Sequence, residues 1–98
     1  STPRAAPPDL PPARIGGLVE CDLRGMRVEE ALDRLDATLD LAAAEGRDEL
    51  RVIHGIGTGA LKRAVGEHLP RSPYVIDCMP ATREDGGAGA TRVILGKD

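Results

Sequence analysis

The chain has 98 residues, a formal net charge of −3 and 41% hydrophobic residues, which suffices for one small domain. It has no Phe or Trp and a single Tyr, so base stacking on aromatic side chains is excluded as the main grip on single-stranded nucleic acid. No apolar run is close to the length of about 18 residues that a membrane-spanning helix needs, and the sequence does not begin with a signal-peptide pattern. Cys21 and Cys78 lie far apart in apolar stretches, which indicates small buried side chains in a reducing compartment. We therefore expect a cytoplasmic protein with no membrane partner.

Residues 1–17 are rich in proline and poor in large apolar side chains, with five of the eight prolines of the chain. Such a segment cannot bury enough apolar surface to offset the entropy lost on ordering. We expect a disordered, extended linker at residues 1–17 and a folded domain at residues 18–98.

The first half of the domain predicts a strand, a helix and a second strand. Residues 18–25 alternate between apolar and charged side chains, which is typical of a strand with one charged face. Residues 28–45 follow a helical period and end before Gly46. The apolar stripe of this helix comprises Val28, Ala31, Leu32, Leu35, Leu39, Ala42 and Ala43. Residues 49–55 form a short apolar run, and the helix between the two strands predicts that they are parallel.

The second half predicts one more helix and two more strands. Residues 59–69 have helical spacing, with Leu61, Ala64, Val65 and Leu69 facing inward, and prolines at positions 70 and 73 end the helix. Residues 74–79 and 91–96 are expected strands, and the connection 80–90 is expected to contain nothing helical, so the pair should be antiparallel. The fold class is therefore α/β: a two-layer sandwich of order β-α-β-α-β-β, with a four-stranded mixed sheet and two helices.

Charge is divided unevenly along the domain. Residues 28–45 carry six acids and one base, whereas residues 51–71 carry four bases and one acid. One face should repel a polyanion and another should attract it, so a protein of net negative charge can still bind phosphates locally.

A glycine-rich loop follows the second strand directly. His54 ends the strand, and the loop carries three alternating glycines, Gly55, Gly57 and Gly59. Glycine allows positive φ and lets an anion approach the backbone, and the following helix N-terminus favours negative charge. Thr58 is the expected N-cap, and Lys62 lies within reach of the same anion. The spacing matches neither the nucleotide P-loop nor the dinucleotide fingerprint, and a tight turn without a ligand remains the alternative.

Asp22 and Arg24 lie on the same face of the first strand, at its carboxyl end. Asp22 would serve as a general base or hold a water or metal, and Arg24 would clamp a phosphate. The alternative is a surface ion pair worth ~0–1 kcal/mol. Because carboxyl ends of parallel strands share an edge, these residues should meet the glycine loop. His54 would then donate or accept the proton, unless it is a buried histidine held by a backbone carbonyl; His68 is expected to be structural.

The stretches "CDLRGMRVEEAL" and "HGIGTGAL" resemble the two hallmark motifs of the Smr, or small MutS-related, domain. The likeness extends over residues 18–95, and the Arg24 version is similar to the branch at the C-terminus of the second bacterial MutS-like protein. The resemblance implies a fold like the C-terminal domain of translation initiation factor three. It also implies DNA or RNA binding and, in many members, nicking endonuclease activity. Because arginine cannot serve as a proton-transfer base, Arg24 is expected to bind phosphate.

The resemblance also implies partners and site residues. The expected partner is double-stranded or branched DNA, with RNA or the ribosome as alternatives, and the domain would hang from an ATPase and clamp module that acts in DNA repair or recombination suppression. The expected catalytic residues are Asp22, His54 and Arg24. The expected nucleic-acid-binding residues are Arg24, Gly55, Gly57, Thr58 and Gly59, which match the two motifs, and also Lys62 and Arg83, which are expected from their charge and position and not from the resemblance.

Three questions stay open at this stage. A non-catalytic nucleic-acid-binding module and an RNA endonuclease acting in ribosome rescue are the alternatives to a DNA-nicking enzyme. The cofactor is unknown; Mg²⁺ is one option, although Glu20 and Asp22 would be its only acidic ligands.

Overall fold

The computed structural model describes residues 19–96, so the linker expected at residues 1–17 lies outside the described residues. Its helices and strands follow the predicted order. They are β1 (Val19–Asp22), α1 (Val28–Ala44), β2 (Glu49–Ile53), α2 (Ala60–His68), β3 (Val75–Pro80) and β4 (Ala90–Leu95). No helix among these is long and apolar enough to cross a membrane.

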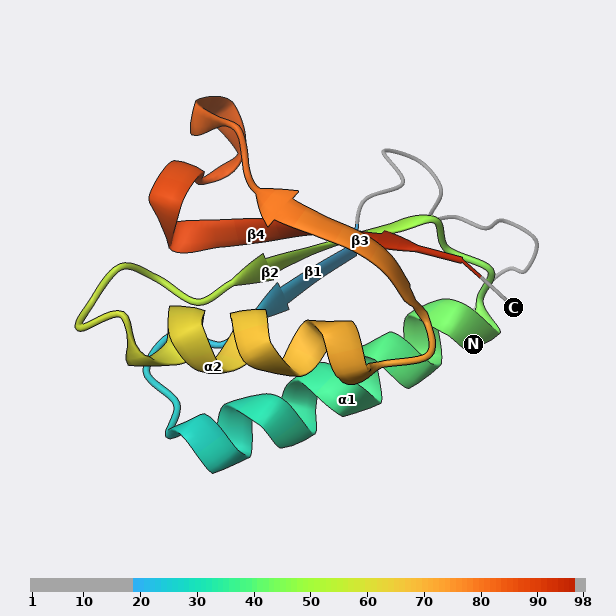
Figure 1. Cartoon of the computed structure of the whole chain (residues 1–98), viewed down its shortest axis with the longest axis horizontal. Helices are drawn as coiled ribbons and strands as arrows, with labels where there is room; N and C mark the ends of the chain where they lie inside the picture. The colour runs from blue at the N-terminus through green and yellow to red at the C-terminus, as the bar shows by residue number, and fades with distance from the viewer. Residues whose placement is uncertain (1–18, 97–98) are drawn as a thin grey trace, which may run out of the picture.

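The sheet has the strand order β1-β2-β4-β3. β1 and β2 are parallel, and β4 is antiparallel to both of its neighbours, β2 and β3. The sheet is therefore mixed, as predicted. Both helices cover the same face of the sheet, so the fold is the predicted two-layer sandwich (Figure 1). The other face of the sheet carries ion pairs, among them Arg92 with Glu49 and Arg51 with Glu20.

The core is aliphatic because the chain offers almost no aromatic residues. α1 buries Ala31, Leu35, Leu39 and Ala42, spaced three or four residues apart, against the sheet. Val28 was predicted to belong to this buried stripe, but it is 38% exposed, because the first turn of α1 lies beyond the ends of β1 and β2. Cys21 is buried and Cys78 partly so, and both are free thiols; burial raises the pKa of Cys21.

The connection between β3 and β4 differs from the prediction. It contains two 3-10 turns, Arg83–Asp85 and Gly87–Gly89, where no helical structure was expected. The carbonyl of Thr82 accepts hydrogen bonds from the N–H groups of Asp85 and Gly87, and the carbonyl of Gly86 accepts the N–H of Gly89, which closes these turns. The connection thereby folds back and brings Gly89 against the loop that follows β2.

The two helices are joined by a side-chain contact. His68 Nε2 lies 2.7 Å from Asp36 Oδ1, which ties the end of α2 to the middle of α1. This placement agrees with the structural role expected of His68. The amino-terminal ends of both helices lie at the edge where β1 and β2 end (Figure 1).

Candidate nucleic-acid interface

Asp22 and Arg24 form a bidentate pair at the end of β1. Arg24 donates from Nε to Oδ1 of Asp22 at 2.9 Å and from Nη2 to Oδ2 at 2.7 Å, and its backbone N–H donates to Oδ1 at 3.1 Å. These hydrogen bonds from Arg24 lower the pKa of Asp22 to about 2. The carboxylate therefore stays ionised at neutral pH but is a weak base, and its main effect is to hold the guanidinium in one orientation.

The loop after β2 uses the conformational freedom of its glycines. Gly55, Gly57 and Gly59 all have positive φ, at 78°, 35° and 90°. The N–H groups of His54 and Gly55 both donate to the carbonyl of Gly89, at 3.0 and 2.9 Å. The loop is thus held on one side by the β3–β4 connection.

The loop also touches the end of β1, as the topology predicted. A Cβ atom at Gly55 would lie 3.2 Å from Cγ of Arg24, which would have to move slightly, and the positive φ of Gly55 also favours glycine there. The first motif and the glycine loop therefore meet at one edge of the sheet.

The start of α2 differs in detail from the prediction. Gly59, in the left-handed conformation, is the N-cap residue in place of Thr58, because positive φ at Gly59 turns the chain directly into the helix. The Thr58 hydroxyl instead accepts the N–H of Ala60 at 3.3 Å. Lys62 lies in the first turn, where the helix dipole and unpaired N–H groups favour an anion.

His54 is buried, with 4% of its surface exposed, on the helix side of the sheet. Its Nδ1 lies 2.9 Å from the carbonyl oxygen of Gly55, and its Nε2 lies 2.9 Å from Oγ1 of Thr91. Since a carbonyl only accepts, Nδ1 carries the proton and donates, and in the neutral ring Nε2 accepts from the Thr91 hydroxyl. This is the geometry of a buried histidine held by a backbone carbonyl. Proton transfer from this ring to a substrate requires one of the two bonds to break first.

A shallow depression of about 460 Å³ collects most of the predicted residues. It is lined by residues 24–28 at the start of α1 and by residues 54–62 of the glycine loop and α2. Its three charged lining residues, Arg24, Arg27 and Lys62, are all basic. Asp22 lies beside it through its pair with Arg24.

Sequence reasoning missed Arg27 and Thr91. Arg27 could have been found as a basic residue three positions after Arg24, whereas nothing local links Thr91 to His54, since 37 positions separate them. Arg83 lies in the first 3-10 turn of the β3–β4 connection and does not line the depression, so its phosphate contact stays a prediction.

The carboxylates do not fit a magnesium site built by the protein. Within residues 19–96, no group of three or more His, Cys, Asp or Glu side chains is placed to hold a metal ion. Glu20 is paired with Arg51, and both oxygens of Asp22 accept from Arg24. We therefore derive no step through a metal.

The fold and this edge define a class of protein: a two-layer α/β domain with a basic, glycine-lined depression at the ends of parallel strands. The family model for the Smr domain matches residues 21–96, and the chain belongs to this family.

Relatives and solved structures agree with this assignment. The chain is 42% identical over 81 residues to Endonuclease MutS2 of Streptococcus equi subsp. equi, and 46% identical over 76 residues to that of Lactobacillus gasseri. These matches cover 83% and 78% of this chain, which spans only 10% of the length of either relative. The crystal structure of the Smr domain of Thermus thermophilus MutS2 superposes with a TM-score of 0.78 at 45% identity, covering 80% of this chain and 98% of that one. YdaL, a stand-alone small MutS-related protein of Escherichia coli, gives 0.79 at 26% identity, covering 86% of this chain and 71% of that one.

Proposed function

We propose that this domain binds DNA through its phosphates and nicks one strand. The observation that carries the proposal is the depression whose charged lining is entirely basic, formed by Arg24, Arg27 and Lys62 around a glycine loop and a helix N-terminus. Such a surface favours an anion with several charges close together. Contacts to phosphates carry little sequence information, so we expect weak sequence preference.

Each side chain has a role that follows from its contacts. Arg24 and Lys62 neutralise the charge that grows on the scissile phosphate, and the backbone of residues 55–59 cradles a phosphate oxygen. Asp22 fixes the fork of Arg24 and orients water on its solvent side. His54 holds the loop through Gly55. When the bond of its unprotonated Nε2 to Thr91 is exchanged for one to the attacking water, Nε2 takes a proton from that water and then passes it to the leaving oxygen.

The relatives named Endonuclease MutS2 support hydrolysis, and their greater length supports a place for this domain in a larger protein. We propose that the full protein is MutS-like, carries an ATPase and clamp module, and acts on double-stranded or branched DNA in repair or in suppression of recombination.

A second candidate function is binding without catalysis. The low pKa of Asp22, about 2, and the burial of His54 with both ring nitrogens bonded favour it, since neither group is free to move a proton. RNA as the substrate of the same site is the third outcome, and both are included in the test.

The test uses supercoiled plasmid DNA and a matched RNA hairpin with the purified chain. We expect nicked circles that are lost with Arg24→Ala and Asp22→Asn and are unchanged with Arg47→Ala, an arginine at the other end of the sheet. His54→Asn tests the proton-transfer role of the ring, with circular dichroism to verify folding. Binding without nicks selects the binding module, and cleavage of the hairpin alone selects RNA. A chelator in parallel reactions tests for a metal requirement.

A further inference from the structure

Ile56, in the middle of the glycine loop, is a large apolar side chain that is exposed and not packed into the core. With 71% of its surface exposed, it is the most exposed large apolar side chain of residues 19–96. The loop that carries it projects beyond the strands at one end of the molecule (Figure 1). Single exposed apolar residues are common, so the position of Ile56 needs further support before it indicates a function.

The backbone beside Ile56 is held firmly. The preceding N–H, of Gly55, donates to Gly89, and the carbonyl of Ile56 accepts the N–H of Gly59 at 3.1 Å. A Cβ atom at Gly89 would lie 3.7 Å from Cγ1 of Ile56, so the β3–β4 connection lies against the loop and supports it. A side chain presented by an ordered turn loses little conformational entropy when it is buried by a partner.

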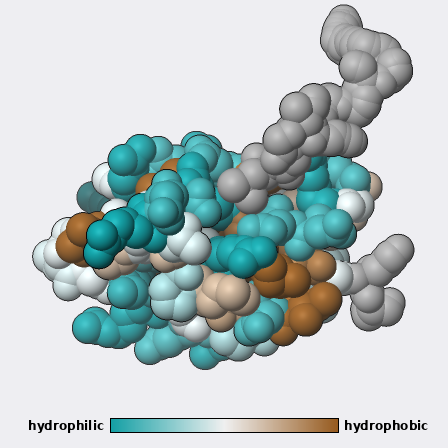
Figure 2. Space-filling view, turned by 90° about the horizontal axis from the view of Figure 1, so that it is seen from above, coloured by the Kyte–Doolittle hydropathy of each residue, from teal (hydrophilic) through white to brown (hydrophobic). Residues whose placement is uncertain are grey.

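The surroundings of Ile56 have the two-part chemistry of a nucleotide. The same depression is lined by basic side chains and by apolar ones, Met26, Val28 and Leu61. Seen from above, the surface around this end of the molecule is mainly hydrophilic, with only small apolar spots (Figure 2). Positive charge can hold a phosphate while an adjacent apolar side chain contacts the sugar or base attached to it.

We propose that Ile56 is a wedge that enters the base stack of bound DNA next to the phosphate gripped by Arg24 and Lys62. This inference rests on the proposed function, because it requires DNA in the depression. Apolar side chains, isoleucine included, insert between base steps in proteins that kink the duplex, at the cost of unstacking that step. The cost is lowest where stacking is already interrupted. Ile56 therefore gives the domain a preference for nicked or mismatched duplex over continuous duplex.

The test measures binding and base unstacking together. A short duplex carries 2-aminopurine beside a nick, and the continuous duplex of the same sequence serves for comparison. The chain should raise the 2-aminopurine fluorescence and bind the nicked duplex more tightly. Ile56→Ala should abolish the fluorescence change and lower affinity for the nicked duplex about tenfold, the expected effect of losing one buried aliphatic side chain.

Ile76→Ala is the matched control, because Ile76 is 68% exposed on β3 and lies outside the depression. It should leave both measurements unchanged, and Ile56→Met should retain most of the fluorescence change. Equal binding and equal fluorescence for the parent chain and Ile56→Ala overturn the wedge and leave the proposed function standing. Failure of the parent chain to bind either duplex overturns both.

Discussion

The two ends of the sheet carry hollows of similar size but different character. The loop pole, defined by residues 24–28 and 54–62, holds about 460 Å³. The tyrosine pole, at the other end, holds about 510 Å³. It is lined by Ala43, Gly46, Arg47, Asp48, Pro73, Tyr74, Leu95 and Gly96.

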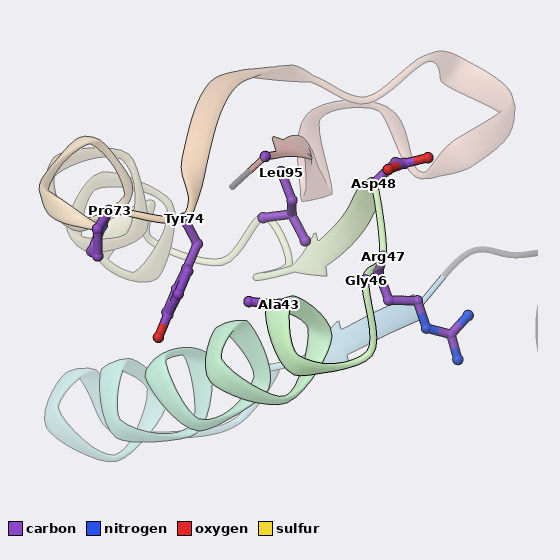
Figure 3. Close-up of a pocket in the computed structure, with 8 residues that line it drawn as sticks. Ala43, Gly46, Arg47, Asp48, Pro73, Tyr74 and Leu95 are labelled. Atoms are coloured by element: carbon purple, nitrogen blue, oxygen red, sulfur yellow. The ribbon is translucent and has the colours of Figure 1, made fainter. Parts of the chain in front are cut away.

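The two poles differ in the charge of their lining and in the backbone beside them, and hardly in volume. At the tyrosine pole the one basic and one acidic lining residue, Arg47 and Asp48, point away from Ala43 and Leu95 (Figure 3). Arg47 is also paired with Glu45 at 3.0 Å. The charged lining of the loop pole is all basic and stands at a helix N-terminus. The larger hollow is therefore the poorer site for a polyanion.

Loss of Arg24 should produce the largest difference between the poles. Arg24→Ala should reduce nicking about a hundredfold, since a preorganised charge at a developing oxyanion contributes on that scale. It should also lower the dependence of DNA affinity on salt by about one counterion. Plasmid nicking and binding titrations at several salt concentrations measure these effects. Arg47→Ala should change neither, and an equal loss with both variants would contradict the assignment of the site.

Removal of the Thr91 hydroxyl should give the next largest effect. Thr91→Val leaves Nε2 of buried His54 without a partner and should lower the free energy of unfolding by about 1–3 kcal/mol. DNA affinity should fall as well, because His54 holds the glycine loop. Urea unfolding and a binding titration are the measurements. Thr91→Ser should restore both quantities; if it behaves like the valine variant, the hydroxyl is not the cause.

Alanine substitutions at one glycine of each pole compare the two poles directly. Gly59, at the loop pole, and Gly46, at the tyrosine pole, both have positive φ and open space where a Cβ would stand. Each change to alanine should therefore cost about 1–2 kcal/mol of unfolding free energy through backbone strain alone. Only Gly59→Ala should also weaken DNA binding. Equal binding losses in the two variants would show that stability, and not loop geometry, controls affinity.

The smallest effect concerns the single tyrosine. Its hydroxyl is directed toward α1 (Figure 3), and its hydrogen bond to the Asp40 carboxylate raises the pKa of Tyr74 above the usual value of 10. The stability from this bond is present below pH 10 and is lost as the pH rises through the raised pKa. Absorbance at the tyrosinate band should titrate above pH 10 and return toward 10 with Asp40→Asn. Gly59→Ala should leave the titration unchanged; a shift there would link the two poles.

Local pattern and topological rules were enough to predict much of the fold. The alternation in residues 18–25 and the helical period of residues 28–45 reflect which face of each element is buried, and a helix between two strands makes them parallel. From this it followed that Asp22, Arg24 and the glycine loop share one edge, and the structure confirms it.

Features that depend on residues distant in the chain could not be predicted. The pairing of β4 with β2, the support of the glycine loop by Gly89 and the Thr91 contact of His54 all join segments more than thirty residues apart. The same holds for the burial of His54, because a ring at a strand end faces solvent or the core depending on what packs over it. Periodicity shows only which face of its own helix or strand a residue occupies. The assembled sheet and helices decide which distant carbonyl, hydroxyl or charged group that residue contacts.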